Sequence, residues 1–369
     1  MKIGIAGAGL TGRLLAWELA ARGHAVQVFD PADGPHEPAA GQATPYAAGW
    51  TAAGMLSPVA ELETGDDDIY ALGQRSLARW PQVLAQLPGA VFHRQQGSLM
   101  LAHRGDEGSA RRMTELLTHK LARQGSDAQA IDAVMRRIDL AELRALEPAI
   151  QGPSQAWLLP GEGQLHTRQA MLALAEAGSR LGVQWHWQTH VEALSPGVLH
   201  ARGGDLGFDW VFDARGLGAR PELPTRGVRG EVLWLHAPGV VLNRPLRLLH
   251  PRHRVYIVPR PGDIVFIGAS EIESEDRGPM SLRSAVELMA AAHSVMPELA
   301  EARIVHMESN LRPALPDNLP RIDTDPGLSR INGLFRHGWL IAPALIERAL
   351  AAFDAARDAG SPSKDNIAP

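Results

Sequence analysis

The chain has 369 residues, of which 45% are apolar, and its formal net charge is −5 at pH 7. This length exceeds what one hydrophobic core usually supports, so two domains are expected. The acidic balance gives no basic footprint for nucleic acid, and no apolar run approaches the length of a membrane span. The chain contains no cysteine, which excludes disulfides, thiolate metal sites, cysteine nucleophiles and a cysteinyl link to a cofactor. The composition therefore predicts a cytoplasmic protein.

The N-terminus carries the pattern of a dinucleotide-binding unit. An apolar run at 2–6 is followed by the sequence Gly-Ala-Gly-Leu-Thr-Gly at 7–12, here called the glycine fingerprint. A helical stretch then ends near Gly23, and a second apolar run at 25–29 ends on Asp30. This order of strand, glycine turn, helix, strand and acid predicts that the chain binds a dinucleotide.

Each glycine of this unit, and the acid that follows it, has a physical role. Gly7 allows a tight turn, Gly9 lets the backbone approach a pyrophosphate, and Gly12 lets the helix pack against the strand. The pyrophosphate would lie on free N–H groups at the positive end of the helix. Asp30 follows Gly12 by 18 residues, where a carboxylate accepts hydrogen bonds from ribose hydroxyls.

Further along the chain, residues 31–48 are rich in Ala, Gly and Pro and are expected to form a long loop. Small residues crowd 49–58, which indicates backbone pressed against a flat surface rather than a flexible linker. The carboxylates at 66–68 predict a helix start, and Pro81 is expected to begin or bend a second helical stretch. Another helix is expected at 107–124.

The middle of the chain is expected to return to the nucleotide domain. Residues 151–163 are expected to form a loop, and Thr167 is expected to cap a helix that runs to Leu181. A strand follows at 183–187, and the buried strand at 210–213 ends in a glycine turn.

From about residue 228, the sequence becomes rich in β-branched residues with short turns between them, which predicts an antiparallel sheet. The expected strands lie at 228–236, 246–250, 254–258 and 264–269, and a helix at 281–293 and a strand at 303–307 follow. The last unit is expected to be a strand from 328, a glycine turn and a helix with Pro343 in its first turn. We predict a discontinuous FAD-binding domain over 1–80, 146–222 and 308–369 and a substrate domain over 81–145 and 223–307.

Four stretches together resemble the D-amino-acid oxidase family of flavoproteins, and within it most closely the glycine oxidases of thiamine biosynthesis. These are the glycine fingerprint, then 52–58, then 228–231 with 256–260 and 267–270, and finally 311–313 with 333–343. The resemblance implies an α/β fold: a Rossmann-like FAD-binding domain with an inserted antiparallel-sheet substrate domain, the D-amino-acid oxidase or glutathione-reductase-2 type. It also implies non-covalently bound FAD.

By this resemblance, 54–56 pass beside the flavin ring, Val191 contacts adenine, and the segment 334–340 wraps the pyrimidine edge. The expected cofactor-binding residues are Gly7, Gly9, Leu10, Thr11, Gly12, Asp30, Gly49, Trp50, Gly54, Met55, Leu56, Val191, Gly216, Leu334, Phe335, Arg336, His337, Gly338, Trp339 and Leu340.

The resemblance also implies oxidation of a small amino acid or amine, with oxygen as the second substrate and hydrogen peroxide as a product. Arg312 is then expected to clamp the substrate carboxylate, because paired guanidinium donors match two carboxylate oxygens. Tyr256 is expected to donate a hydroxyl to the same carboxylate, and Arg336 to add positive charge. Glycine is the leading substrate, with sarcosine or small D-amino acids as side substrates.

The chain departs from the family at three places. Leu334-Phe335 stand where His-Tyr or His-Phe is common, and His337 stands where Asn is common. Glu271 stands where glycine oxidases often have an apolar residue. Glu271 either faces the pocket, paired with Arg254 or the substrate amine, or points to solvent with the acidic residues that follow it. An amino-acid dehydrogenase with another acceptor, a flavoprotein that modifies a partner protein, and a flavin-binding scaffold remain open as alternatives, as does a homo-oligomer. No histidine spacing indicates a metal site.

Overall fold

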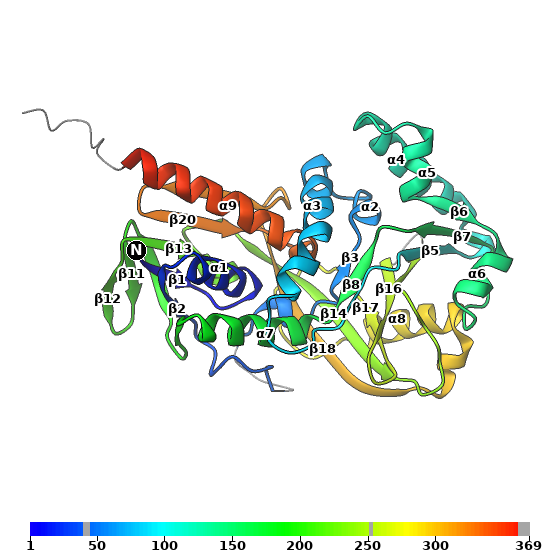
Figure 1. The fold of residues 1–369 in the computed structure, drawn as a ribbon. Coiled ribbons are helices and arrows are strands. Elements are labelled where there is room, and N and C mark those ends of the chain that lie inside the picture. Colours follow the sequence, from blue (N-terminus) through cyan, green and yellow to red (C-terminus); the bar gives the residue numbers. More distant parts are fainter. Residues whose placement is uncertain (40–44, 251–253, 361–369) are drawn as a thin grey trace, which may run out of the picture.

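The computed structural model describes residues 1–39, 45–250 and 254–360. Figure 1 shows two halves side by side, one built on a six-stranded sheet and the other on an eight-stranded sheet. Between them lie helices α2 (Pro58–Glu61) and α3 (Asp67–Leu84) and a small sheet of β3 (Met55–Leu56), β8 (Gly163–Leu165) and β4 (His93–Arg94). No helix in the described ranges is long and apolar enough to span a bilayer.

The six-stranded sheet has the strand order β19-β20-β13-β1-β2-β9. Its strands are β1 (Lys2–Ala6), β2 (Ala25–Phe29), β9 (Gln184–His186), β13 (Trp210–Asp213), β19 (Arg321–Asp325) and β20 (Leu328–Asn332). All neighbours run parallel except β19 and β20. The sheet therefore gathers strands from the beginning, middle and end of the chain.

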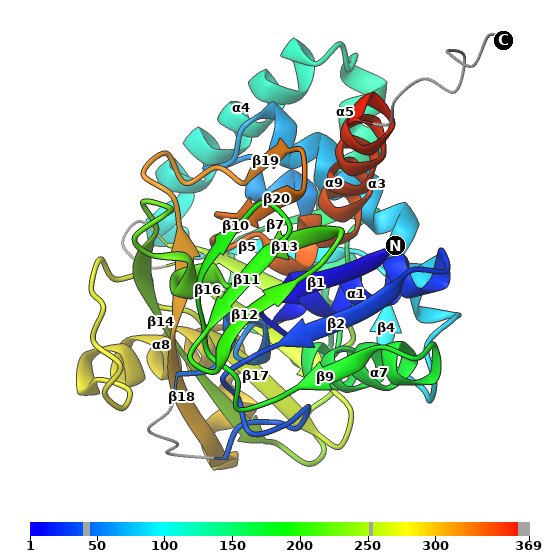
Figure 2. The same ribbon diagram turned by 90° about the vertical axis from the view of Figure 1, so that its left-hand side faces the viewer.

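Alternation along β1 and β2 explains the two covered faces of this sheet. Ile3, Ile5, Val26 and Val28 belong to the core under α1 (Leu10–Ala21), α7 (Thr167–Arg180) and α9 (Gly338–Gly360), whereas Phe29 packs on the opposite side. That opposite side is covered by a three-stranded sheet of β10 (Val191–Ser195), β11 (Val198–Ala201) and β12 (Gly204–Gly207). Figure 2 shows these strands in front of β1 and α1.

Helix α9 contains a proline in its interior. The prediction that Pro343 lies in the first turn is wrong, because the helix begins at Gly338. Proline has no N–H, so the carbonyl of Trp339 four residues earlier loses its usual helical donor. The indole Nε1 of Trp80, on α3, donates to that carbonyl at 2.8 Å and replaces the missing bond. This contact ties α3 to the start of α9.

The eight-stranded sheet has the order β18-β14-β17-β16-β15-β5-β7-β6, antiparallel except where β5 meets β15. Its strands are β5 (Ser98–Ala102), β6 (Arg136–Ile138), β7 (Gln155–Leu159), β14 (Arg226–His236), β15 (Leu246–Leu249), β16 (Arg254–Arg260), β17 (Ile264–Gly268) and β18 (Arg303–Ala314). Helix α8 (Leu282–Val295) packs on one face. Helices α4 (Glu107–Arg123), α5 (Ala128–Val134) and α6 (Leu140–Leu146) lie at the far end in Figure 1.

Three local predictions need correction. Residues 151–163 are not all loop, because Gln155–Leu159 form β7, which lies between β5 and the edge strand β6 of the eight-stranded sheet. Pro81 does not begin a second helix but lies inside α3 near its C-terminus. The cap of α7 is His166 rather than Thr167: its Nδ1 accepts from the backbone N–H of Gln169 at 3.5 Å.

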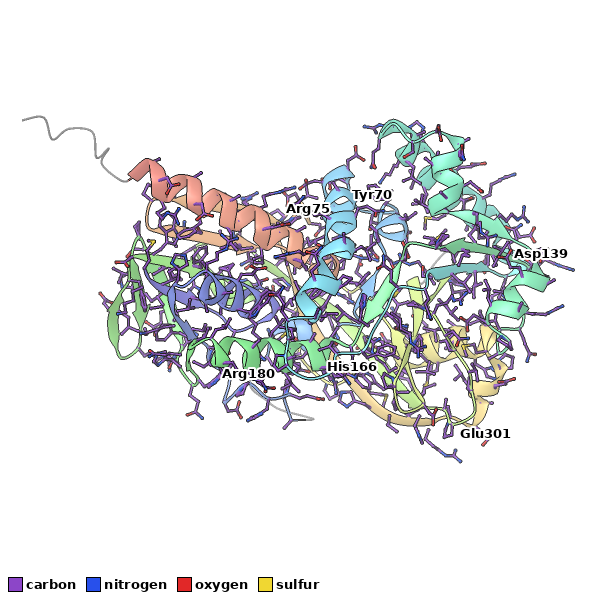
Figure 3. The ribbon with its side chains drawn as sticks, in the orientation of Figure 1. Tyr70, Arg75, Asp139, His166, Arg180 and Glu301 are labelled. Carbon is purple, nitrogen blue, oxygen red and sulfur yellow. The ribbon has the colours of Figure 1, made fainter. Side chains whose placement is uncertain are left out.

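His166 lies at the start of α7, where the two halves of the molecule meet (Figure 3). Burial lowers its pKa to about 4, and the charges of Arg260 and Arg168 add to this effect. A neutral imidazole can accept the capping hydrogen bond, so the buried position and the cap are consistent with each other.

The domain boundaries given above stay a prediction.

Candidate active site

One continuous cavity of about 740 Å³ joins the glycine fingerprint to the open face of the eight-stranded sheet. Its nucleotide end is lined by Gly7, Gly9 and Asp30, and its far end by Tyr256 and Arg312. Residues from both sheets and from α9 therefore contribute to a single site.

The nucleotide end has the close-packed turn that the fingerprint predicts. Gly7 has φ +100°, and a Cβ there would lie 2.5 Å from the carbonyl oxygen of Ala214. A Cβ on Gly12 would collide with the carbonyl oxygen of Gly7. Around Gly9, by contrast, a Cβ would meet only Ala47 among the described residues, at 3.3 Å. The backbone at Gly9 is thus open toward the cavity.

The donors and acceptors at this end suit a dinucleotide. Helix α1 starts after Gly9, which has no side chain to cap it, so its first N–H groups are available to an anion. Asp30 accepts hydrogen bonds from the N–H groups of Ala8 at 2.6 Å and Ala32 at 2.9 Å. Each carboxylate oxygen has a second lone pair for a ribose hydroxyl.

A buried arginine, which the sequence reasoning missed, holds the backbone of the glycine fingerprint through hydrogen bonds. Arg13 is 1% exposed; its Nε donates to the carbonyl of Ala8 and its Nη1 to that of Met171, both at 2.7 Å. Burial lowers its pKa to about 10, and the carboxylate of Asp30 opposes that shift. Arg13 therefore orients the turn without lining the cavity.

The middle of the cavity is formed by the small-residue stretch and the start of α9. Gly54 has φ +68°, and a Cβ there would collide with the carbonyl oxygen of Leu165. Trp339 Nε1 donates to the carbonyl of Gly49 at 3.0 Å, which joins the two segments. Gly338, Trp339 and Leu340 line the cavity at the N-terminus of α9, where the helix dipole stabilises negative charge.

Most of the predicted site residues line this cavity. They are Gly7, Gly9, Leu10, Thr11, Asp30, Gly49, Gly54, Met55, Val191, Gly216, Tyr256, Arg312, Leu334, Phe335, Arg336, Gly338, Trp339 and Leu340. Four predicted residues do not line the cavity: Gly12 packs α1 on β1, and Trp50, Leu56 and His337 are buried. Their predicted roles in binding remain predictions.

The far end of the cavity depends on two strand glycines. In the sheet, Tyr256 stands opposite Gly268, and a Cβ on Gly268 would lie 2.9 Å from the tyrosine hydroxyl. A Cβ on Gly230 would lie 2.5 Å from the guanidinium carbon of Arg312. The two side chains thus lie flat over neighbouring strands and point along the cavity floor.

In the described part of the chain, Arg312 has no carboxylate as an ion-pair partner. Its Nη1 and Nη2 donate to the carbonyl of Ser270 at 3.1 and 3.2 Å. Among the described residues, no carboxylate lies within 4.0 Å of it. Burial lowers the pKa of Arg312, and Tyr256 opposes that shift. An anion is the missing partner for this guanidinium.

Tyr256 is suited to donate a hydrogen bond to the same anion. Burial raises its pKa above the ordinary value, and the positive charge of Arg312 opposes part of that shift. The phenol therefore keeps its proton at neutral pH and can act as a donor.

Arg336 differs from Arg312 because two carboxylates already contact it. Its Nε lies 3.1 Å from Glu61 Oε2, and its Nη1 donates to Glu271 at 2.9 Å. Glu271 lines the cavity, and its side chain is also 38% exposed. Arg336 is thus an ion-pair partner of Glu271, and the predicted pairing of Glu271 with Arg254 stays a prediction, because the Arg254 side chain lies outside the part of the chain that the structure describes.

Glu61 and Arg247 belong to this cluster and were missed by the sequence reasoning. Arg247 Nη2 donates to Glu61 at 2.5 Å, and His337 Nδ1 lies 3.2 Å from the same carboxylate. Burial raises the pKa of Glu61, but Arg336 and Arg247 outweigh that effect and hold it well below the ordinary value. The only sequence signal was an acid just after the resembling stretch 52–58.

No group of three or more His, Asp or Glu side chains suited to a metal occurs within residues 1–39, 45–250 and 254–360. The donors that line the cavity include backbone N–H groups, the phenols of Tyr46 and Tyr256 and several guanidiniums, which suit phosphates, a flavin and a carboxylate.

Comparison with known proteins places the chain in a family. The FAD dependent oxidoreductase family matches residues 2–351, so the chain belongs to that family of flavin enzymes. The putative thiamine biosynthesis oxidoreductase ThiO of Rhizobium etli is 36% identical over 347 residues, 94% of each protein. The glycine oxidase of Geobacillus kaustophilus is 28% identical over 96% of this chain and 95% of its own length.

The fold agrees with this assignment. The crystal structure of glycine oxidase from Geobacillus kaustophilus has a TM-score of 0.78 and 24% identity, covering 98% of this chain and 95% of that chain. The predicted α/β fold of the D-amino-acid oxidase type is thus confirmed. The fingerprint turn, Asp30, Gly49, residues 51–55 and the start of α9 line the part of the cavity that could hold FAD.

Proposed function

We propose that this chain oxidises glycine to its imine, with non-covalently bound FAD and oxygen, in the cytoplasm and in the service of thiamine thiazole synthesis. Sarcosine and small D-amino acids are side substrates. The observation that carries the proposal is the unpaired guanidinium of Arg312 beside the protonated Tyr256, at the far end of a cavity that begins at the glycine fingerprint. The names of the relatives from Rhizobium etli and Geobacillus kaustophilus support it.

In this proposal the protein supplies position rather than a chemical group. Arg312 binds the two carboxylate oxygens of glycine, and Tyr256 donates a third hydrogen bond, which fixes the α-carbon with respect to the cavity floor. When bound, FAD supplies the hydride acceptor and the path of the electrons to oxygen, which leaves as hydrogen peroxide. The released imine is hydrolysed by water to the keto acid.

Two other activities fit the same cavity. An amino-acid dehydrogenase would pass its electrons to an acceptor other than oxygen, and a partner-modifying flavoprotein would leave free amino acids unreacted. Hydrogen peroxide formed from glycine under air, measured against dye reduction without oxygen, distinguishes the first. We expect peroxide and keto acid in equal amounts; dye reduction with no peroxide under air would assign the dehydrogenase. The partner-modifying activity would give neither product from glycine.

Non-covalent binding of FAD is tested separately. The chain has no cysteine for a thioether link, so acid precipitation of the purified yellow protein should release all the flavin into the supernatant. Flavin that stays with the precipitate would contradict this part of the proposal.

A further inference from the structure

The substrate end of the cavity holds more charge than one carboxylate clamp requires. Among the described residues that line this end, Arg247, Arg312 and Arg336 are cationic, and Glu61 and Glu271 are anionic. The two carboxylates contact Arg247 and Arg336. One guanidinium, that of Arg312, is left for an anionic ligand. The positive charges of Arg247 and Arg336 are therefore balanced within the protein, and the positive charge of Arg312 is the one offered to the substrate.

The nitrogens of Arg336 are all directed at carboxylate oxygens. Its Nε is 3.1 Å from Glu61 Oε2, its Nη2 is 3.4 Å from Glu61 Oε1, and its Nη1 is 2.9 Å from Glu271 Oε2. A ligand carboxylate that approached Arg336 would have to displace one of these contacts and would meet the charge of the remaining acids.

Of the two acids, Glu271 is the one whose charge a ligand in the cavity would meet, and so it can affect which ligands bind. Glu61 is 12% exposed and shared by Arg247, Arg336 and His337, so it is fixed within the protein. The side chain of Glu271 is 38% exposed, lines the cavity and contacts Arg336 from the open side. The charges of both Arg336 and Glu271 also act on Arg312, so the three groups lie near one another at this end of the cavity.

We infer that Glu271 restricts this site to substrates with one carboxylate, because it occupies the face of Arg336 that would bind a second one. The inference rests on the proposed function, since it takes Arg312 as the clamp of the first carboxylate. The substrate class is therefore small amines with one carboxylate and a neutral N-substituent. Amines with two carboxylates are disfavoured through repulsion by Glu271 and loss of the Arg336 contact.

The test uses two ligands that cannot be oxidised at nitrogen. Methoxyacetate has one carboxylate and an ether oxygen in place of the amine; diglycolate adds a second carboxylate to the same skeleton. Their Kd values are measured on the FAD-loaded enzyme by calorimetry and by perturbation of the flavin spectrum. The quantity compared between variants is the ratio of the two Kd values.

In Glu271→Gln the ratio should shift toward diglycolate by about five- to ten-fold, the size expected for one like charge at a partly exposed site. Glu271→Asp, which keeps the charge, should retain the parent preference. Glu273→Gln is the matched control, because Glu273 is in the same loop, pairs with Arg226 and does not line the cavity. Glu271→Met removes the charge without an amide and serves if the glutamine variant does not fold.

A ratio that is unchanged in both Glu271→Gln and Glu271→Met, with normal methoxyacetate binding, would overturn this inference alone. An equal shift in Glu273→Gln would also overturn it, since the effect would then come from the general charge of the loop. If methoxyacetate did not bind the parent enzyme at all, the carboxylate site at Arg312 would be wrong, and the proposed function would fail together with this inference.

Discussion

The arginines at the far end of the cavity differ in whether a carboxylate of the protein already pairs with them. Arg312 has no carboxylate within ion-pair distance in the described part of the chain, whereas Arg336 and Arg247 share Glu61. A guanidinium held by the backbone carbonyls of Ser270 and Arg229 keeps its charge for a ligand. Arg336, although predicted to add positive charge, is already balanced by the protein.

Replacement of Arg312 tests its role as the carboxylate clamp. Arg312→Ala should raise the KM for glycine by about 30- to 1,000-fold, because a charged contact to a desolvated carboxylate is lost. Arg312→Lys should recover only part of this, since an ammonium cannot form two parallel hydrogen bonds. FAD content, measured by absorbance, should stay at the parent level in both variants. A parent-like KM in the alanine variant would remove Arg312 from the site.

The pH dependence of activity should follow the substrate amine. Hydride leaves the α-carbon only when the nitrogen lone pair is free, so kcat/KM for glycine should rise with pH. Burial raises the pKa of Tyr256, and so the phenol stays protonated throughout that rise and does not produce it. Profiles measured with substrates of different amine pKa should shift accordingly; identical profiles would indicate a group of the protein.

At the scale of elements, two neighbouring strands provide a floor on which the substrate-binding side chains lie. Gly230 on β14 and Gly268 on β17 leave room for the Arg312 guanidinium and the Tyr256 ring. Strand glycines usually weaken a sheet, and they are retained where another group must approach closely. The resembling stretches 228–231 and 267–270 therefore have a structural reason.

Gly230→Ala should impair binding more than folding. The new Cβ would lie 2.5 to 2.6 Å from three guanidinium atoms of Arg312, which can move aside because they end a flexible side chain. We expect the KM for glycine to rise by about ten-fold, with a free energy of unfolding within about 1 kcal/mol of the parent value. Gly207→Ala, where a Cβ meets nothing within 4 Å, is the control. Equal kinetics in both variants would contradict the proposed floor.

The sequence predicts elements better than it predicts the charge cluster. The fingerprint, α1 and five strands of the eight-stranded sheet, β14 to β18, follow from local apolar periodicity and glycine positions, whereas β5 and β6 were not predicted. The strand at 155–159 was missed because its short apolar run is flanked by Gly and Pro, which are also typical of loops. Glu61 meets Arg247 and Arg336, which are 186 and 275 residues away along the chain, so no local pattern could indicate the cluster.

For the molecule as a whole, the active site exists only where the two halves meet. The six-stranded sheet supplies the turn at Gly7 and Asp30, and the eight-stranded sheet supplies Tyr256 and Arg312. Helix α9 joins them: it packs on the first sheet (Figure 1), and its first residues Gly338, Trp339 and Leu340 line the cavity. Both halves must therefore be folded together before a dinucleotide and an amino acid can be held side by side.

The most direct measurement is rapid mixing of the FAD-loaded enzyme with glycine in the absence of oxygen, while the visible absorption of oxidised flavin is recorded. The account predicts that the absorption bleaches with a rate that saturates with glycine, and that Arg312→Ala needs a far higher glycine concentration for the same rate. Flavin that stays oxidised at saturating glycine, in an enzyme that contains its full complement of FAD, would contradict the account.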